Sequence, residues 1–186
     1  MNLALFKEKY LSKKNTILIL IIILLIIVAI ILYLILRKNE TQKKETFSTF
    51  YSNDSSISIL LSDKYKFSKS ENESYKLILD SVSLDSNIYF SEVNMGNIRD
   101  EKKFIEGDKN DYISKFSNIN NVSDITETTV GEKKAYNYNF NYRQNMYVDV
   151  YWIIDNNKFL IIDFNINTDK LDKNIIEDVL NNITFN

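Results

Sequence analysis

The longest apolar run of the chain, ILILIIILLIIVAIILYLIL, extends from Ile17 to Leu36 without a charged side chain. A helix of this length rises about 30 Å, at about 1.5 Å per residue, and so matches the hydrocarbon core of a bilayer. A helix on the surface of a soluble domain normally keeps a polar face, and this run has none. We therefore predict a single-pass transmembrane helix over residues 17–36, in contact with the lipid bilayer.

Basic residues flank this run on both sides. Four lysines precede it, and two further basic pairs follow it, at 37–38 and 43–44. Because no small-residue cleavage site follows the run, the pattern favours an uncleaved signal anchor over a removed signal peptide. The count of basic residues is equal on the two sides, which leaves the opposite orientation open. We favour a short cytoplasmic head over residues 1–16, which stays inside readily and places the C-terminal part outside the cell membrane.

The rest of the chain divides into a polar segment and a segment with the alternation of β-strands. Residues 37–56 are rich in Ser, Thr, Lys and Glu without a sustained period, and are predicted to form a tether. Residues 57–186 are predicted to form one extracytoplasmic domain. Its strand-like runs are ISILLS (57–62), YKLILD (75–80), NIYFSEVN (87–94), ITETTV (125–130), KAYNYNFNY (134–142), MYVDVYWII (146–154) and FLIIDFNIN (159–167).

Two segments of this domain have helical spacing. Residues 108–118 place apolar side chains on one face behind a candidate cap at Asp108, and 100–106 add a short turn before them. Residues 169–183 carry an apolar stripe after Asp169 and Asp172, acidic residues that suit a helix N-terminus. The order of elements predicts an α+β domain, with an antiparallel sheet of about six or seven strands covered by two helices.

The run YNYNFNY (136–142) alternates aromatic residues with asparagine. A hairpin turn at Asn156-Asn157 would pair Trp152 with Ile161, and a loop over 143–146 would pair Tyr142 with Tyr147. In this register the aromatic residues of the run share one face with Tyr147, Tyr151 and Ile153, which we interpret as core. A ligand platform is the alternative, since a slip of one residue in either turn would reverse the faces.

The opposite face of the same strands is the candidate binding patch. It carries one tryptophan beside amides and a carboxylate, which could hold a small ligand. Cover by the N-terminal strands or the tether is the alternative. The patch consists of Trp152, Asn137, Asn139, Asp163 and Asn165.

The composition removes several kinds of chemistry. The chain has no His and no Cys, which excludes Ser-His-Asp and Cys-His triads, thiolate nucleophiles and Cys/His zinc sites. Asp149 and Asp163 are expected on opposite faces of the sheet, so they cannot act as a pair on one substrate. DKNDY (108–112) begins like a calcium loop but lacks the later glycine and glutamate. We therefore expect no catalytic residues, no metal and no cofactor.

The net charge of −2 is unevenly divided. Residues 1–45 carry eight Lys or Arg and three Asp or Glu, whereas residues 46–186 carry fifteen and twenty-two. A domain with a net charge of −7 does not provide the clustered positive charge that phosphate backbones require. We therefore expect no nucleic-acid partner.

The C-terminal third, YWIIDNNKFLIIDFNINTDKLDKNIIEDVLNNITF (151–185), is a hairpin followed by a closing helix. Together with the preceding order of strands and helix over 57–185, it resembles the PsbP-like (Mog-type) family of α/β/α sandwich domains. That family includes bacterial membrane-attached and lipoprotein forms as well as photosystem accessory proteins. The resemblance includes no catalytic motif, and it implies a non-enzymatic accessory or binding domain.

Three classes of function remain. We expect a membrane-anchored, non-enzymatic binding or accessory domain outside the cytoplasmic membrane, with an envelope protein or a small ligand as partner. The alternative is a structural subunit of a secretion or conjugation complex of the envelope. An enzyme is the third class, and it would depend on carboxylates, Tyr, Lys or a metal.

Overall fold

The computed structural model describes residues 17–18, 21–33, 45–96 and 98–186, and the chain divides into two units, Met1–Lys44 and Glu45–Asn186. In the first unit, residues 17–18 and 21–33 are helical and their side chains are exposed. Within the described residues, no helix meets the length and apolarity required to cross a bilayer. The predicted head, 1–16, and the end of the predicted span, which includes Leu36, lie outside the described residues.

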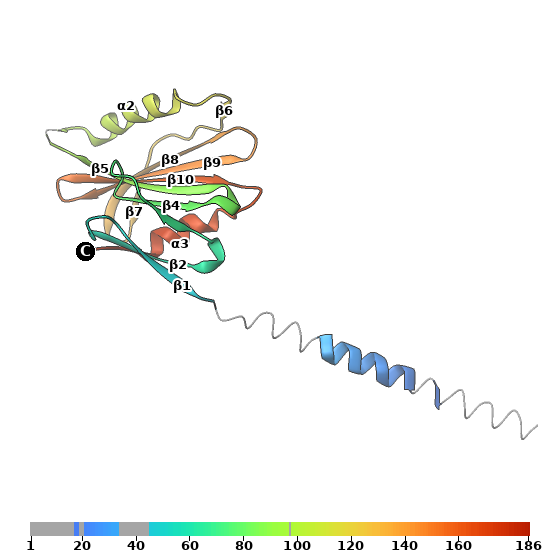
Figure 1. Cartoon of the computed structure of the whole chain (residues 1–186). Helices are drawn as coiled ribbons and strands as arrows, with labels where there is room; N and C mark the ends of the chain where they lie inside the picture. Colours follow the sequence, from blue (N-terminus) through green and yellow to red (C-terminus); the bar gives the residue numbers. More distant parts are fainter. Residues whose placement is uncertain (1–16, 19–20, 34–44, 97) are drawn as a thin grey trace, which may run out of the picture. The chain divides into compact units, whose positions relative to one another are not determined.

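The second unit is an antiparallel α+β domain, as the sequence predicts, but its strands form two sheets rather than one. Figure 1 shows α2 on one side of the large sheet, and α3 with the small sheet on the other. The elements are β1 (Phe47–Tyr51), β2 (Ile57–Ser62), η1 (Asp63–Tyr65), β3 (Ser68–Ser70), β4 (Leu77–Ser81), η2 (Val82–Leu84), β5 (Ser86–Asn94), α2 (Glu101–Ile113), β6 (Ile119–Asn120), β7 (Thr126–Val130), β8 (Lys133–Tyr142), β9 (Met146–Asp155), β10 (Lys158–Asn167), α3 (Asn174–Asn182) and β11 (Ile183–Phe185).

The large sheet has the strand order β3-β4-β5-β10-β9-β8-β6, and β7 also pairs with β8. The small sheet has the order β1-β2-β11, so it joins the first strands of the domain to its last strand. Each of the seven predicted strands corresponds to one observed strand. The short strands β1, β3, β6 and β11 are additions that the alternation in the sequence does not indicate.

One side of the large sheet packs against α3 and the small sheet. The alternation of β2 directs Ile57, Ile59 and Leu61 inward, where all three are buried. Ile175 and Val179 of α3 are buried on the same side, at the four-residue spacing of a helix face. The strands of the large sheet add to this core chiefly Leu77, Leu79, Ile88, Phe90, Ile153, Leu160, Ile162, Phe164 and Ile166.

The other side of the large sheet packs against α2. The helix buries Ile105 completely, and the Phe104 ring lies edge-on to Trp152, with 6.0 Å between the ring centroids. Its first turn is held by Glu101, which accepts hydrogen bonds from Lys134 and from the Tyr136 hydroxyl. A second core therefore lies beneath α2.

The hairpin register predicted around Asn156-Asn157 is confirmed. Trp152 is the partner of Ile161, and Asn156 has a positive φ of 56°. The register predicted for the preceding hairpin is wrong by one residue, because β9 begins at Met146 and leaves a three-residue loop. Tyr142 therefore pairs with Met146, and Arg143 takes the positive φ, 58°, that the tighter loop requires.

This slip exchanges the faces of β8, although the aromatic run is core as expected. Tyr138 and Phe140 are buried together with Val148, Val150 and Trp152 beneath α2. The predicted neighbours Tyr147, Tyr151 and Ile153 belong to the opposite core, beside α3.

The first helix begins earlier than expected. The side chain of Asp100 accepts a hydrogen bond of 3.0 Å from the backbone of Lys103 and caps α2, which then runs through Gly107. Asp108 is therefore an interior helical residue, and DKNDY cannot form a calcium loop.

The last helix is shorter than expected. It begins at Asn174, after Asp169 and Asp172, and ends at Asn182. Residues 183–185 instead form β11 and pair with β2.

The predicted tether extends too far toward the domain. Residues 47–51 form β1, which pairs with β2 along its whole length. Four of its five residues are exposed, so the run lacks the buried alternation that identifies a strand in sequence.

Candidate functional site

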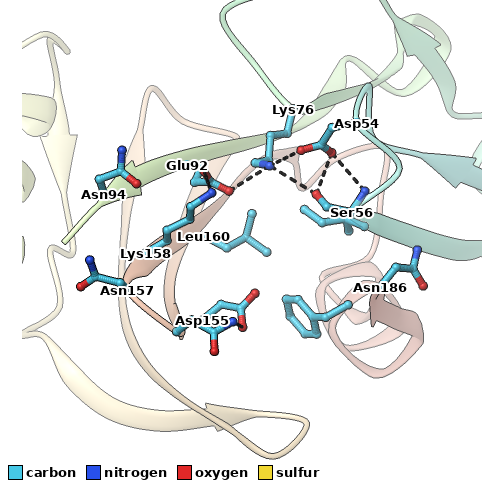
Figure 2. A pocket seen from close by; sticks show the side chains of 13 residues that line it. Asp54, Ser56, Lys76, Glu92, Asn94, Asp155, Asn157, Lys158, Leu160 and Asn186 are labelled. Atoms are coloured by element: carbon cyan, nitrogen blue, oxygen red, sulfur yellow. Dashed lines mark hydrogen bonds and ion pairs between the residues drawn. The ribbon is translucent and has the colours of Figure 1, made fainter. Parts of the chain in front are cut away.

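A pocket of about 350 Å³ lies where the end of the β9–β10 hairpin meets the small sheet. Its walls come from the β1–β2 connection, the residue before β4, the end of β5, the β9–β10 turn and the C-terminal strand β11. The buried side chains of Ile57 and Leu160 contribute an apolar floor. Charged and amide side chains surround that floor, as Figure 2 shows.

Four charged side chains form a continuous ion-pair network along one wall. The Lys76 ammonium lies 2.5 Å from Oδ2 of Asp54 and 2.9 Å from Oε2 of Glu92. The other carboxylate oxygen of Glu92 lies 2.6 Å from the Lys158 ammonium. The network thus alternates in charge from Asp54, between β1 and β2, to Lys158 on β10.

Asp54 also stabilises the β1–β2 connection through hydrogen bonds within it. Its Oδ1 accepts hydrogen bonds from the hydroxyls of Ser52, at 2.7 Å, and Ser56, at 2.6 Å. These bonds hold the carboxylate that faces Lys76. The connection is fixed to the large sheet by the backbone bond of 2.8 Å from Asn53 to the carbonyl of Lys76.

The network keeps its members charged. The hydrogen bond from Lys76 is the main cause that holds the pKa of Asp54 well below its usual range, followed by the bonds from Ser56. Burial acts to lower the pKa of Lys76, but its bonds to Asp54 and Glu92 outweigh burial and raise it. Burial likewise acts to raise the pKa of Glu92, and the bonds from Lys158 and Lys76 lower it overall.

A second ion pair lies on the other side of the pocket. Oδ1 of Asp155 lies 2.6 Å from the Lys133 ammonium and also accepts a hydrogen bond of 3.2 Å from the Asn156 amide. The same ammonium lies 4.8 Å from the centroid of the Phe185 ring, a cation–π contact with β11. Asp155 is thereby held by a lysine of β8 and by the turn residue that follows it.

The structure does not bring the five residues of the predicted patch together. Trp152 is only 1% exposed and lies beneath α2, so it is not a surface residue. Asp163 and Asn165 lie on this same face, where the Asn165 amide donates a 2.9 Å hydrogen bond to Asp163. The remaining two, Asn137 and Asn139, face the opposite side because of the slip in β8.

Trp152 is therefore covered, but by α2 and not by the N-terminal strands or the tether that the alternative interpretation named. Of the predicted membrane-spanning limits, Ile17 is described as helical and exposed, and Leu36 lies outside the described residues.

Asp149 and Asp163 occupy opposite faces, as the sequence predicts. Asp163 is opposite Val150, and Asp149 is opposite Phe164, so the two carboxyl groups alternate across the sheet. Burial raises the pKa of each to about 6. The Tyr112 hydroxyl donates a hydrogen bond to Asp163, which partly offsets this effect. These are two separate buried carboxyl groups and cannot act as a pair.

Metal ligation has no support within the described part of the chain, which contains no group of three or more Asp or Glu residues arranged to hold an ion. In the pocket, each side-chain carboxylate is paired with a lysine. The pocket therefore presents paired charges and amide groups rather than a cluster of carboxylates.

Sequence reasoning missed this pocket. Its charged residues are scattered from Asp54 to Lys158, and only the Asn156-Asn157 turn beside it had a signal of its own. The confirmed β9–β10 hairpin does place Asp155 opposite Lys158, which is the one part of the pocket that the sequence could have indicated.

Comparison with solved structures identifies the fold. The chain is similar to the cyanobacterial PsbP (CyanoP) of Synechocystis sp. PCC 6803, solved in solution, with a TM-score of 0.58 and 7% sequence identity. The similarity covers 78% of this chain and 95% of that chain. No protein-family model matches the sequence, and no curated protein matches it. The domain therefore has the PsbP-like fold that the C-terminal third predicts.

Proposed function

We propose that the chain is a non-enzymatic, membrane-anchored binding or accessory domain, displayed outside the cytoplasmic membrane. The observation that carries the proposal is that residues 21–33 form an exposed helix without a polar face. The large apolar side chains of this helical segment are between 44% and 63% exposed, and they occur on every side of the helix. A helix with no polar face has no favourable orientation in water.

A bilayer is the environment that suits such a helix. The uncharged sequence continues on both sides of this segment, from residue 17 to residue 36. Twenty residues of helix match the thickness of the hydrocarbon core, and the basic residues beyond both ends suit the headgroup regions. We therefore retain residues 17–36 as the anchor, with 1–16 as a cytoplasmic head.

The domain itself supports binding. The pocket presents charged and amide groups around an apolar floor, the composition typical of sites that orient a small polar ligand. The PsbP-like fold, whose members include accessory proteins, is consistent with this function. The pocket is our candidate binding site, and it replaces the patch around Trp152.

Membrane fractionation tests the anchor. The wild-type chain is expected in the membrane pellet and is expected to resist alkaline carbonate extraction. Replacing Ile23 and Ile27 with Arg introduces two charges at the centre of the span, each costing about 2.5–3.5 kcal/mol on insertion scales. This variant is expected in the soluble fraction, and the matched Ile23→Leu, Ile27→Leu variant in the pellet. A soluble wild-type chain would contradict the proposal.

Cysteine labelling tests the orientation, since the chain has no native cysteine. Ser83 is exposed on η2, so a Ser83→Cys variant is accessible to reagent. A membrane-impermeant maleimide is expected to label this variant in intact cells as fully as in lysed cells. Labelling that requires lysis would place the domain in the cytoplasm.

A further inference from the structure

Two opposite charges stand side by side at the candidate binding site. Asp155 and Lys158 are directly paired residues at the end of the β9–β10 hairpin. Residues directly opposite in an antiparallel pair direct their side chains to the same face of the sheet. Both residues line the pocket, and Figure 2 shows Lys158 beside Glu92 and Asp155 at another part of the wall.

These two charges do not neutralise each other. Lys158 is bound to Oε1 of Glu92, and Asp155 is bound through Oδ1 to Lys133. Each therefore has an ion-pair partner other than the residue directly opposite it. Within the described residues, Oδ2 of Asp155 accepts no hydrogen bond, and the ammonium of Lys158 contacts one acceptor although it has three donors.

Lys76 provides an internal comparison. Its ammonium contacts three acceptors, in Asp54, Glu92 and Ser56, and its side chain is 17% exposed. The side chains of Lys158 and Asp155 are 49% and 34% exposed. Lys76 is thus saturated and structural, whereas Lys158 and Asp155 retain hydrogen-bonding capacity toward the pocket.

The remaining lining fits a ligand with an apolar part. Leu160 lines the pocket from β10, two residues after Lys158, and Phe185 borders it from β11. Asn94 and Asn157 add amide groups that donate and accept hydrogen bonds. The volume, about 350 Å³, is at the small end of the range for ligand pockets.

We infer that this pocket binds a small zwitterion of the amino-acid or dipeptide class, with an apolar side chain. The ligand carboxylate contacts Lys158, the ligand ammonium contacts Oδ2 of Asp155, and the apolar side chain rests on Leu160 and Phe185. A ligand with only a negative charge would be repelled by Asp155 and Glu92, and a ligand with only a positive charge would be repelled by Lys158. This inference rests on the proposed function, since it names the ligand of the proposed binding domain.

Titration calorimetry with capped and uncapped peptides tests the inference on the full chain in detergent micelles. Glycyl-leucine is the zwitterionic probe, N-acetylglycyl-leucine has no ammonium, and glycyl-leucine amide has no carboxylate. The wild-type chain is expected to bind glycyl-leucine about tenfold more tightly than either capped peptide, since each cap removes one charge-assisted hydrogen bond.

Two variants assign each end of the ligand. Lys158→Gln is expected to weaken glycyl-leucine binding about tenfold and to leave binding of the amide unchanged. Asp155→Asn is expected to weaken glycyl-leucine equally and to leave binding of the acetylated peptide unchanged. Lys170→Gln, a change at an exposed lysine outside the pocket, is the matched control and is expected to have no effect. Thermal unfolding of each variant establishes that it is folded.

Two results would overturn the inference. One is no binding of glycyl-leucine at about 10 mM, where a Kd of about 1 mM gives near-saturation. The other is equal binding of capped and uncapped peptides, which would indicate a neutral ligand. Either result leaves the membrane fractionation unaffected, so failure of the ligand and failure of the anchor are distinguishable.

Discussion

The Asn137 side-chain amide donates a hydrogen bond of 2.5 Å to Oδ1 of Asp149, across the pair of strands β8 and β9. Asp149 is 5% exposed, and its other oxygen lies 3.4 Å from the Tyr147 hydroxyl. The amide predicted to face a ligand thus satisfies a buried carboxyl group. The same contact leads to a testable dependence of stability on pH.

Asp149→Asn is expected to stabilise the domain at neutral pH and to have little effect in acid. Burial raises the pKa of Asp149 from 3.8 to about 6, so the folded state holds the proton more tightly than the unfolded state. Stability therefore falls as pH rises from about 4 to about 6. The asparagine keeps an acceptor for Asn137 and cannot ionise, so the gain at pH 7.5 is up to about 3 kcal/mol.

Urea unfolding at pH 4 and pH 7.5 measures this effect. Asp124→Asn, at an exposed aspartate, is the matched control and should change stability little at either pH. An Asp149→Asn variant that is equally destabilised at both pH values would show that Asp149 is already ionised without penalty in the fold.

Lys76→Met is expected to destabilise the domain by about 1–3 kcal/mol, because it leaves Asp54 without its cation and removes one of two from Glu92. Lys64→Met is the comparison. The pair between Lys64 and Glu45, 3.2 Å apart, is about half exposed on both sides, so solvent screens it and its loss should change stability little. Equal losses for the two variants in urea unfolding would mean that the pocket network has no greater structural role than a surface ion pair.

Alanine at two glycines is expected to act in opposite directions. Gly107 lies inside α2 with open space where a Cβ would stand. Because alanine has the higher helix propensity, Gly107→Ala should raise the free energy of unfolding by about 1 kcal/mol. Gly131, in the turn between β7 and β8, also has open space but a φ of +58°. Gly131→Ala should cost about 1 kcal/mol, since an L-residue rarely adopts that conformation. Thermal unfolding of both variants tests the helical continuity of α2, and destabilisation by Gly107→Ala would contradict it.

Ile105→Ala is expected to cost about 2–5 kcal/mol, because Ile105 is fully buried beneath α2. Phe104→Ala should cost less, since Phe104 is 38% exposed. Trp152 is the single tryptophan of the chain, and its ring contacts Phe104. Its fluorescence therefore reports the docking of α2. A larger loss from Phe104→Ala, measured by urea unfolding, would show that the aromatic contact rather than Ile105 holds the helix.

The sequence predicts this fold where side-chain alternation and turn chemistry agree. The hairpin around Asn156 is the clearest case, because asparagine tolerates positive φ and alternating strands flank it. The three-residue loop before Met146 gives no such signal. Arg143 adopts φ 58° there, a conformation unusual for arginine, so the loop length could not be read from residue type and the register of β8 was lost.

The candidate site was beyond sequence reasoning for a different reason. Lys76 immediately precedes β4, Glu92 lies on β5 and Lys158 lies on β10. Only the strand order β4-β5-β10 makes these three residues neighbours. Asp54 reaches the network because β1 and β2 form a second sheet, and the exposed run 47–51 does not indicate one. Long-range strand order is not encoded in the local periodicity on which the prediction rests.

The pairing of β11 with β2 has a consequence for the order of folding. Ile59 is fully buried and pairs with Ile183. The edge of β2 that binds β11 therefore stays unpaired until the C-terminal segment has been synthesised. Contacts between such distant parts of a chain are slow to form. We therefore expect the small sheet to close last, in a late cooperative step, and until then the apolar face of β2 is open to misassembly or to a chaperone.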